Sequence, residues 1–183
     1  MNYSADIHLL INVILQKEPE RALEIYEEAR KRNPRDTQLA AKMGQALQKT
    51  HQYGKAINYY REAVKNQDHS RLRYDLAELL MKLKTYEKAE KVIMEALKDQ
   101  SHDLNSLISQ AKFTGLLAKV HERSGNIDLA IKSLTEAKEI RAKSLKRIQV
   151  EQPDAVHEHK QLTANICHQM AEHAVNQRDF DSG

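Results

Sequence analysis

Histidine is the residue type whose spacing in this sequence comes nearest to a metal site. The stretch "VHEHK" places His157 and His159 two residues apart. On a helix this spacing turns the two imidazoles about 200° apart, so they would not face one metal ion. His168 and His173 are five residues apart, but histidines are common at exposed helix positions. The sequence therefore predicts no metal site.

Other signatures of catalysis are missing from the 183 residues. The sequence contains no glycine-rich phosphate loop, no CxxC or HExxH zinc pattern and no GxSxG stretch. The single cysteine, Cys167, excludes an intramolecular disulfide, and we interpret it as a small apolar residue of a helix. A cysteine-poor chain also fits a reducing compartment. We expect neither an enzyme nor a protein that needs a cofactor.

Positive charge is concentrated in one segment. Residues 132–147 carry six basic and two acidic side chains. One interpretation is a solvated helix face, and the other is contact with an acidic protein partner, for which Lys143, Lys146 and Arg147 are the candidates. Nucleic acid fits less well, because the net charge is only +3 and no aromatic residues alternate with the basic ones.

The elements that would hold these residues are helices. The chain is 40% hydrophobic, with five glycines, three prolines and no tryptophan, which indicates an almost entirely helical protein. The stretches "PERALEIYEEAR", "QYGKAINYYREAV", "YEKAEKVIMEAL" and "IDLAIKSLTEAK" share an alanine pattern. Their first alanines are Ala22, Ala56, Ala89 and Ala130, spaced 34, 33 and 41 residues apart. A period near ~34 residues with paired helices is typical of tetratricopeptide repeats.

The resemblance to tetratricopeptide repeats extends to individual positions. That family has small residues at positions 8, 20 and 27 of each repeat, where two helices approach closely. Position 20 is Ala22, Ala56, Ala89 and Ala130; position 27 is Ala29, Ala63, Ala96 and Ala137; position 8 is Gly44, Ala77, Ala118 and Ala171, with Leu10 as the exception in the first repeat. Large apolar residues occupy position 7 (Leu9, Met43, Leu76, Leu117, Met170) and position 24 (Tyr26, Tyr60, Ile93, Leu134). We predict an all-α fold, a tetratricopeptide-repeat solenoid of stacked antiparallel helix hairpins.

The predicted array covers residues 1–183. Its repeats are residues 3–35, 36–69, 70–99 and 100–152, followed by 153–183 as the first helix of a truncated fifth repeat. The second helix of the fourth repeat has no breaker from Ile127 to Gln152, roughly 39 Å at 1.5 Å per residue, and the first helix of the fifth is expected over about 154–177. This extended hairpin should project and offer a contact surface.

The run "IHLLINVIL" is too short to cross a membrane and lacks the features of a signal peptide, so we expect no direct membrane insertion. It is apolar around most of a helix, and the chain stops where a further helix should begin. We therefore interpret the chain as a segment of a longer solenoid. The isolated segment could associate through this run, by the residues Ile7, Leu10, Ile11 and Ile14.

Tetratricopeptide arrays often bind peptides on their concave side, which the first helices line. Positions 5 and 9 there pair Ile7 with Ile11, Ala41 with Gln45, Tyr74 with Glu78, and Gly115 with Lys119. No Lys and Asn clamp for a terminal carboxylate results, so an internal helix or strand of a large partner fits better than a free acidic tail. The candidate groove residues are Gln45, Tyr74, Glu78 and Lys119.

Three stretches resemble one family more specifically: "KTHQYGKAINYYREAVK", "YDLAELLMKLKTYEKAEKVIMEAL" and "LKRIQVEQPDAVHEHKQLTANICHQMAEHAVNQRDF". They are similar to the tetratricopeptide-repeat-protein-21 family, from about Tyr26 to Phe180, and the irregular "RIQVEQPDAV" is the most diagnostic part. The resemblance implies a non-catalytic subunit of intraflagellar transport complex A, which acts in retrograde ciliary transport, cilium assembly and the sorting of membrane-protein cargo.

The family resemblance also implies partners and a location. The partners would be other protein subunits of that complex, and the location would be the cytoplasm and the cilium, at the axoneme and basal body. The alternative is a peptide-binding tetratricopeptide adaptor of a chaperone or enzyme-regulatory complex. The missing carboxylate clamp speaks against a chaperone adaptor, and a regulatory array would need a linked catalytic domain.

Overall fold

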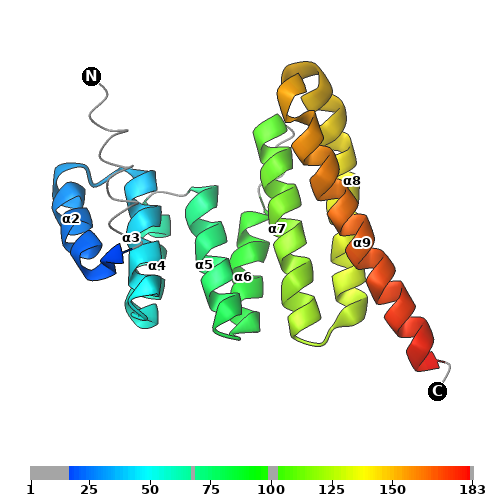
Figure 1. Cartoon of the computed structure of the whole chain (residues 1–183), viewed down its shortest axis with the longest axis horizontal. Helices are drawn as coiled ribbons and strands as arrows, with labels where there is room; N and C mark the ends of the chain where they lie inside the picture. Colours follow the sequence, from blue (N-terminus) through cyan, green and yellow to red (C-terminus); the bar gives the residue numbers. More distant parts are fainter. Residues whose placement is uncertain (1–16, 67–68, 99–102, 182–183) are drawn as a thin grey trace. The chain divides into compact units, whose positions relative to one another are not determined.

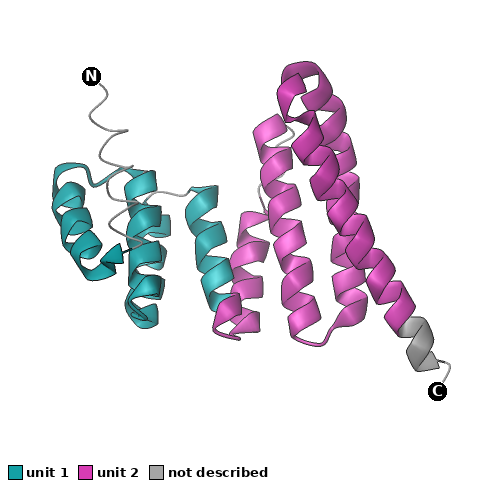
Figure 2. Ribbon diagram, viewed as in Figure 1, with its two compact units in different colours: residues 1–80 teal, residues 81–183 magenta. Residues whose placement is uncertain are grey.

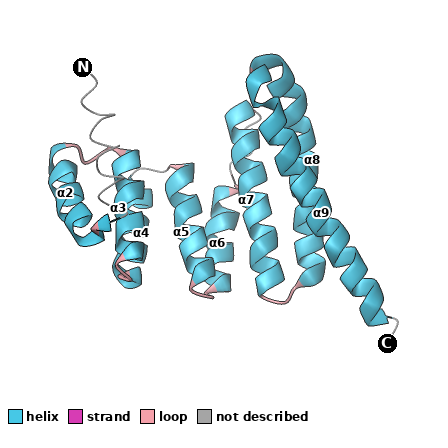
Figure 3. Ribbon diagram, viewed as in Figure 1, coloured by secondary structure: helices cyan, strands magenta, loops and turns pink. Residues whose placement is uncertain are grey.

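The computed structural model describes residues 17–66, 69–98 and 103–181, and within them it contains helices and short loops but no strand (Figures 1 and 3). The all-α fold class predicted from the sequence is confirmed. In chain order the α-helices are α2 (Pro19–Arg32), α3 (Thr37–Lys49), α4 (Tyr53–Asn66), α5 (Ser70–Lys82), α6 (Tyr86–Ala96), α7 (Leu104–Arg123), α8 (Ile127–Glu151) and α9 (Val156–Asp181). A 3₁₀ turn, η1 (Pro153–Ala155), joins the last two.

The helices pack into two compact units, residues 1–80 and 81–183 (Figure 2). In the first unit α3 packs against both α2 and α4, and in the second unit α7 packs against α6 and α8, while α8 also packs against α9. Consecutive helices thus form hairpins. Most of α5 belongs to the first unit, and its last two residues belong to the second.

Local sequence sets where these helices begin. Pro19 is the first residue of α2, a position that needs no backbone N–H donor. The Asp36 carboxylate caps α3 by accepting hydrogen bonds from the backbone N–H groups of Gln38 (2.9 Å) and Leu39 (3.1 Å). Asp103 caps α7 in the same way through the N–H of Ser106 (3.0 Å). These caps satisfy donors that have no partner inside the helix.

Three hairpins turn through one residue in the left-handed region. These are His51 (φ 58°), Lys84 (φ 58°) and Gly125 (φ 86°), each five residues before a position-20 alanine. The Asn126 N–H then donates to the His121 carbonyl (2.8 Å), and the Gln52 N–H to the Leu47 carbonyl (2.9 Å). Such bonds close a helix C-terminus at a left-handed residue. These turns are 33 and 41 residues apart, the same spacings as those of Ala56, Ala89 and Ala130.

Two of the repeat positions predicted to be tightly packed, positions 20 and 24, are buried in all four hairpins that the structure describes there. The position-20 alanines Ala22, Ala56, Ala89 and Ala130 are each 0% exposed. The position-24 residues Tyr26, Tyr60, Ile93 and Leu134 are also buried. Burial raises the pKa of the Tyr26 phenol to about 12. Position 27 differs between the hairpins, since Ala137 is buried whereas Ala29, Ala63 and Ala96 are half-buried.

The long hairpin of the second unit has its own core. Ala118 from α7, Leu134 and Ala137 from α8 and Ile166 from α9 form one buried cluster, with Met170 packed against it. The predicted position-8 residue Ala171, one residue further on, is exposed. The cluster therefore lies on one side of α9, and the opposite side faces solvent.

The predicted long helix of the fourth repeat is confirmed, and its neighbour needs a correction. Helix α8 has 25 residues and ends at Glu151, one residue before the predicted end. The next helix does not begin at residue 154, because Pro153 opens a 3₁₀ turn and α9 starts only at Val156 and runs to Asp181. The repeat boundaries themselves stay predictions. The run from Ile7 to Leu15, with Leu10 at position 8, lies outside the described residues.

Candidate partner-binding surface

The predicted groove residues are distributed over both units. Gln45 lies on α3 and is half-buried, while Tyr74 and Glu78 lie on α5 and are half-buried and exposed. These three belong to the first unit, and the exposed Lys119 on α7 belongs to the second. The four residues are thus divided between the two units. Their role in binding stays a prediction.

Gly115 on α7 lies one turn before the predicted groove residue Lys119 and has free space beside its Cα. A Cβ atom added to Gly115 would meet nothing within 4 Å, although this glycine lies in the interior of a 20-residue helix. Glycine costs about 1 kcal/mol relative to alanine at such a position. Lys119 follows one turn later and is exposed. This part of α7 therefore has a half-buried glycine one turn before an exposed cation.

The predicted basic candidates share one face of α8. Lys143, Lys146 and Arg147 are spaced three and four residues apart, which places them side by side on a helix. Both lysines are exposed. The Arg147 guanidinium forms an ion pair with Glu151 one turn later, with Nε donating to Oε1 at 3.0 Å and Nη2 2.9 Å from the same oxygen. Among the described residues, neither lysine has an anionic partner at ion-pair distance.

Not every basic residue of the segment 132–147 contributes to that face. Arg141 is 9% exposed and lies with Ser144 and Ile148 on the buried side of α8. The Ser144 hydroxyl donates to the Arg141 carbonyl at 3.0 Å. The view of this segment as one solvated basic face is therefore wrong at Arg141, because four- and seven-residue spacings align it with the buried Ala137 and Ile148.

Arg141 affects a histidine on the neighbouring helix. The pKa of His159 on α9 is lowered from 6.5, first because the ring is partly buried, then because Arg141 and, more weakly, Lys112 repel the imidazolium, against an opposing effect of Glu158. Folding of the second unit thus disfavours the protonated imidazole relative to an exposed histidine.

Sequence reasoning missed Val150, which is 84% exposed. It lies four residues after Lys146 and three after Arg147, so it extends the basic face by one turn. The helical spacing could have identified it, because the apolar residues of α8 that are buried follow the register of Ala137 and Ile148 instead. An exposed valine is common on protein surfaces, but this one lies one turn after Lys146, which has no anionic partner at ion-pair distance among the described residues.

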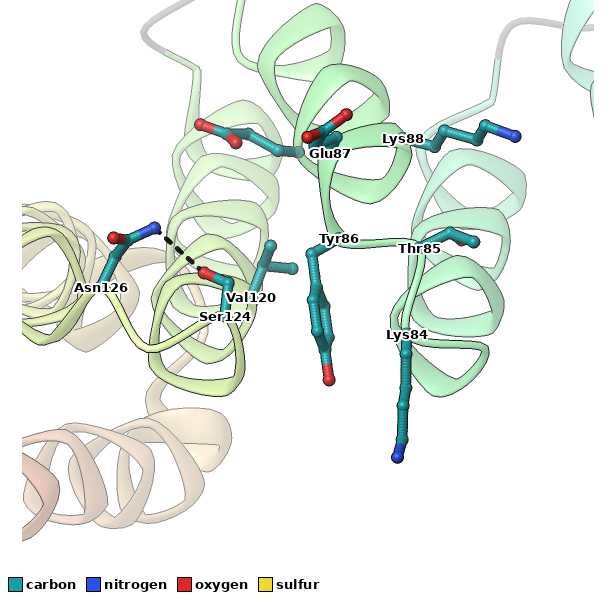
Figure 4. A pocket seen from close by; sticks show the side chains of 9 residues that line it. Lys84, Thr85, Tyr86, Glu87, Lys88, Val120, Ser124 and Asn126 are labelled. Carbon is teal, nitrogen blue, oxygen red and sulfur yellow. Dashed lines mark hydrogen bonds between the residues drawn. The ribbon is translucent and has the colours of Figure 1, made fainter.

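A separate cleft of about 510 Å³ opens in the second unit between the start of α6 and the end of α7. Figure 4 shows the Tyr86 ring between Val120 and Ser124 on one side and Thr85 on the other. The Asn126 side chain donates a hydrogen bond to the Ser124 hydroxyl at 3.2 Å. The cations Lys84 and Lys88 are matched by Glu87 and Glu90 in its lining, which is thus polar without a dominant charge.

The histidines do not assemble a metal site in the described part of the chain, where no group of three or more His, Cys, Asp or Glu side chains converges. His173 on α9 lies 3.7 Å from Glu122 on α7, and His168 lies 3.4 Å from Glu172.

Cys167 is exposed rather than packed as a small apolar residue. No helix in residues 17–66, 69–98 or 103–181 combines the length and apolarity of a membrane span.

Solved structures with the same architecture define the class of protein. MamA residues 41 to the end from Desulfovibrio magneticus RS-1 aligns with a TM-score of 0.55 and 19% identity, covering 93% of this chain and 94% of that one. The structure titled MamA MSR-1 C2 gives a TM-score of 0.56 and 19% identity over 75% of each chain. This likeness concerns the fold, which is that of the tetratricopeptide-repeat proteins.

The sequence comparisons are more specific. The family model described as "Tetratricopeptide repeat protein 21 forth ARM domain" matches residues 39–183. Human tetratricopeptide repeat protein 21B is 48% identical over 165 residues, human protein 21A is 43% identical over 165 residues, and the Caenorhabditis elegans homologue is 31% identical over 166 residues. The chain belongs to the tetratricopeptide repeat protein 21 family, as the sequence resemblance predicted. Each match covers 90% of this chain but only 12% of the relative.

Proposed function

We propose that this chain is a non-catalytic scaffold segment that binds other protein subunits of intraflagellar transport complex A, and that it acts in retrograde ciliary transport and cilium assembly. The single observation that carries the proposal is the family match over residues 39–183. The repeat fold supports the scaffold part of it, because such arrays bind partners through extended surfaces. The comparisons indicate no enzyme family.

We propose that the chain acts by non-covalent binding of its partners and catalyses no reaction. Buried small residues and their large neighbours hold each hairpin rigid, so that exposed side chains keep fixed positions before a partner arrives. Preorganisation of this kind reduces the ordering cost of binding. The contact residues that we propose are Gln45, Tyr74 and Glu78 in the first unit and Lys119, Lys143, Lys146 and Arg147 in the second.

The proposed location is the cytoplasm and the cilium, including the axoneme and basal body. A rescue experiment tests the proposal in ciliated cells that lack the longer parent protein. The cells receive the parent with or without residues 3–180, and retrograde movement is recorded by live imaging. We expect the shortened parent to leave transport proteins accumulated at ciliary tips. Full rescue by the shortened parent would contradict the proposal.

A further inference from the structure

The C-terminal half of α8 combines three features on one exposed face. Lys143 and Lys146 carry positive charges with no anionic partner at ion-pair distance among the described residues, Arg147 shares its charge with Glu151, and Val150 exposes 84% of its surface. Their spacing of three, four and seven residues aligns them along about two turns. We call these four residues, Lys143, Lys146, Arg147 and Val150, the tip face.

The opposite side of the same helix is firmly packed. Ile148 is 0% exposed and Ser144 is 1% exposed. The buried side therefore holds the helix in place, while the tip face is exposed to solvent. A rigid helix presenting charge and an apolar side chain loses little freedom when a partner binds.

We propose that the tip face is a docking site for an acidic amphipathic segment of a partner protein, in which apolar and acidic residues share one face. The inference rests on the proposed function and names the chemistry of one partner. Carboxylates of the segment would meet Lys143 and Lys146, while an apolar side chain would cover Val150. Electrostatic complementarity would set the rate and register of association, and burial of Val150 would slow dissociation.

Other anionic partners fit this face less well. Single-stranded nucleic acid is usually held by aromatic side chains that stack on bases, and none belongs to the tip face. An anionic membrane surface is bound by helices with several large apolar residues beside the basic ones, whereas the tip face offers one valine. An acidic amphipathic protein segment needs only basic side chains and one exposed apolar side chain, and the tip face has both.

Fluorescence anisotropy of the 183-residue chain tests the proposal directly. The probe is a labelled synthetic helix of about 15 residues with leucines at helical spacing and glutamates beside them on the same face. A peptide of identical composition with scattered leucines is the comparison. We expect saturable binding of the first peptide, weakened by added salt because exposed charge pairs are screened, and clearly weaker binding of the second.

Variants locate the site. Lys143→Glu with Lys146→Glu should weaken binding about tenfold or more, and Val150→Ser about threefold, following rim-charge and apolar-contact energetics. The matched control is Lys132→Glu with Lys138→Glu, which makes the same charge change at two exposed positions of the same helix and should stay within about twofold. Circular dichroism checks that every variant is folded.

Several outcomes would overturn the proposal. One is no saturable binding of the first peptide up to about 1 mM; another is an equal loss in the Lys132 and Lys138 control. Equal binding of both peptides, together with no effect of Val150→Ser, would mean that the tip face binds any acidic peptide by charge alone and does not recognise an amphipathic segment. Displacement of the peptide by phosphatidylserine vesicles or single-stranded DNA, at lower concentration than by unlabelled peptide, would assign the face to another class of partner.

The rescue experiment described above separates this inference from the proposed function. If residues 3–180 are needed for retrograde transport but the tip face binds no acidic peptide, the scaffold function stands and the docking site is wrong. If the peptide binds at the tip face but residues 3–180 are dispensable for transport, the docking site stands and the proposed function is wrong.

Discussion

Gly44 on α3 lies directly against the ring of Tyr60 on α4. A Cβ atom at residue 44 would overlap the Tyr60 ring carbons Cζ and Cε1 and the phenol oxygen. Tyr60 is 0% exposed, and its hydroxyl donates to the Ala41 carbonyl at 3.4 Å. The ring therefore has little room to move. This pair explains why position 8 of the second repeat is a glycine and position 24 a tyrosine.

Replacing Gly44 by alanine should destabilise the first unit. Overpacking a tight contact costs about 1–3 kcal/mol, and the gain in helix propensity of about 1 kcal/mol offsets only part of it. We expect a net loss of about 1–2 kcal/mol in urea unfolding followed by circular dichroism. Gly115→Ala is the control, because its Cβ would meet nothing within 4 Å, and it should stabilise. Equal effects of the two substitutions would refute the packing argument.

Substitutions at two of the left-handed turn residues should change the stability of the second unit in opposite directions. Lys84→Gly should stabilise the second unit by about 0.5–1 kcal/mol, because a lysine with φ of 58° is in a conformation that costs an L-residue energy. Gly125→Ala should destabilise the same unit by about 1 kcal/mol, since φ is 86° there. Thermal unfolding of both variants measures this. Destabilisation by Lys84→Gly would show that its side chain contributes more than the turn costs.

The two sides of α8 should respond differently to truncation. Ile148→Ala removes atoms from a site that is 0% exposed and should cost about 2–4 kcal/mol of unfolding free energy. Val150→Ala, two residues further on, should change it by less than about 0.5 kcal/mol, because Val150 is 84% exposed. Denaturant titrations compare them. A large loss for Val150→Ala would mean that this side chain has a structural role and is not left for a partner.

His159 predicts a pH dependence of stability. Its pKa in the folded chain is lowered below 6.5 by burial and then by the Arg141 charge, so the unfolded chain takes up the proton more readily. The contribution of the neutral His159 ring to the free energy of unfolding is present in full above pH 6.5. It is lost as the pH falls through the lowered pKa of the folded chain. His159→Gln should therefore have a shallower decline in melting temperature between about pH 7.5 and pH 5 than the unsubstituted chain. Parallel curves would contradict the assignment.

Much of the fold could be predicted because its requirements are local. The four position-20 alanines and the large residues at position 24 follow from the close approach of paired helices, and all of them are buried. The length of α8 could be predicted to within one residue because nothing between Ile127 and Gln152 breaks a helix. The 3₁₀ turn that Pro153 opens between α8 and α9 was not predicted.

The candidate surface was less predictable for a physical reason. Whether Gln45 and Lys119 can contact one partner depends on the arrangement of helices from different repeats, which no local spacing specifies. Arg141 and Val150 are different cases. Their registers relative to Ile148 indicate a buried arginine and an exposed valine, so a helical projection of residues 127–151 could have corrected the assignment of the basic face.

Affinity capture of the tagged parent protein from ciliated cells, followed by mass spectrometry, tests the central claim most directly. Three forms are compared: the intact parent, the parent without residues 3–180, and the parent with Lys143, Lys146 and Arg147 changed to Glu. We predict that the intact form recovers the other subunits of the transport complex and that the deleted form loses at least one of them. The charge-reversed form should recover less of that same subunit than the intact form does. Recovery of the full set by all three forms, or of chaperones or a phosphatase in place of those subunits, would contradict it.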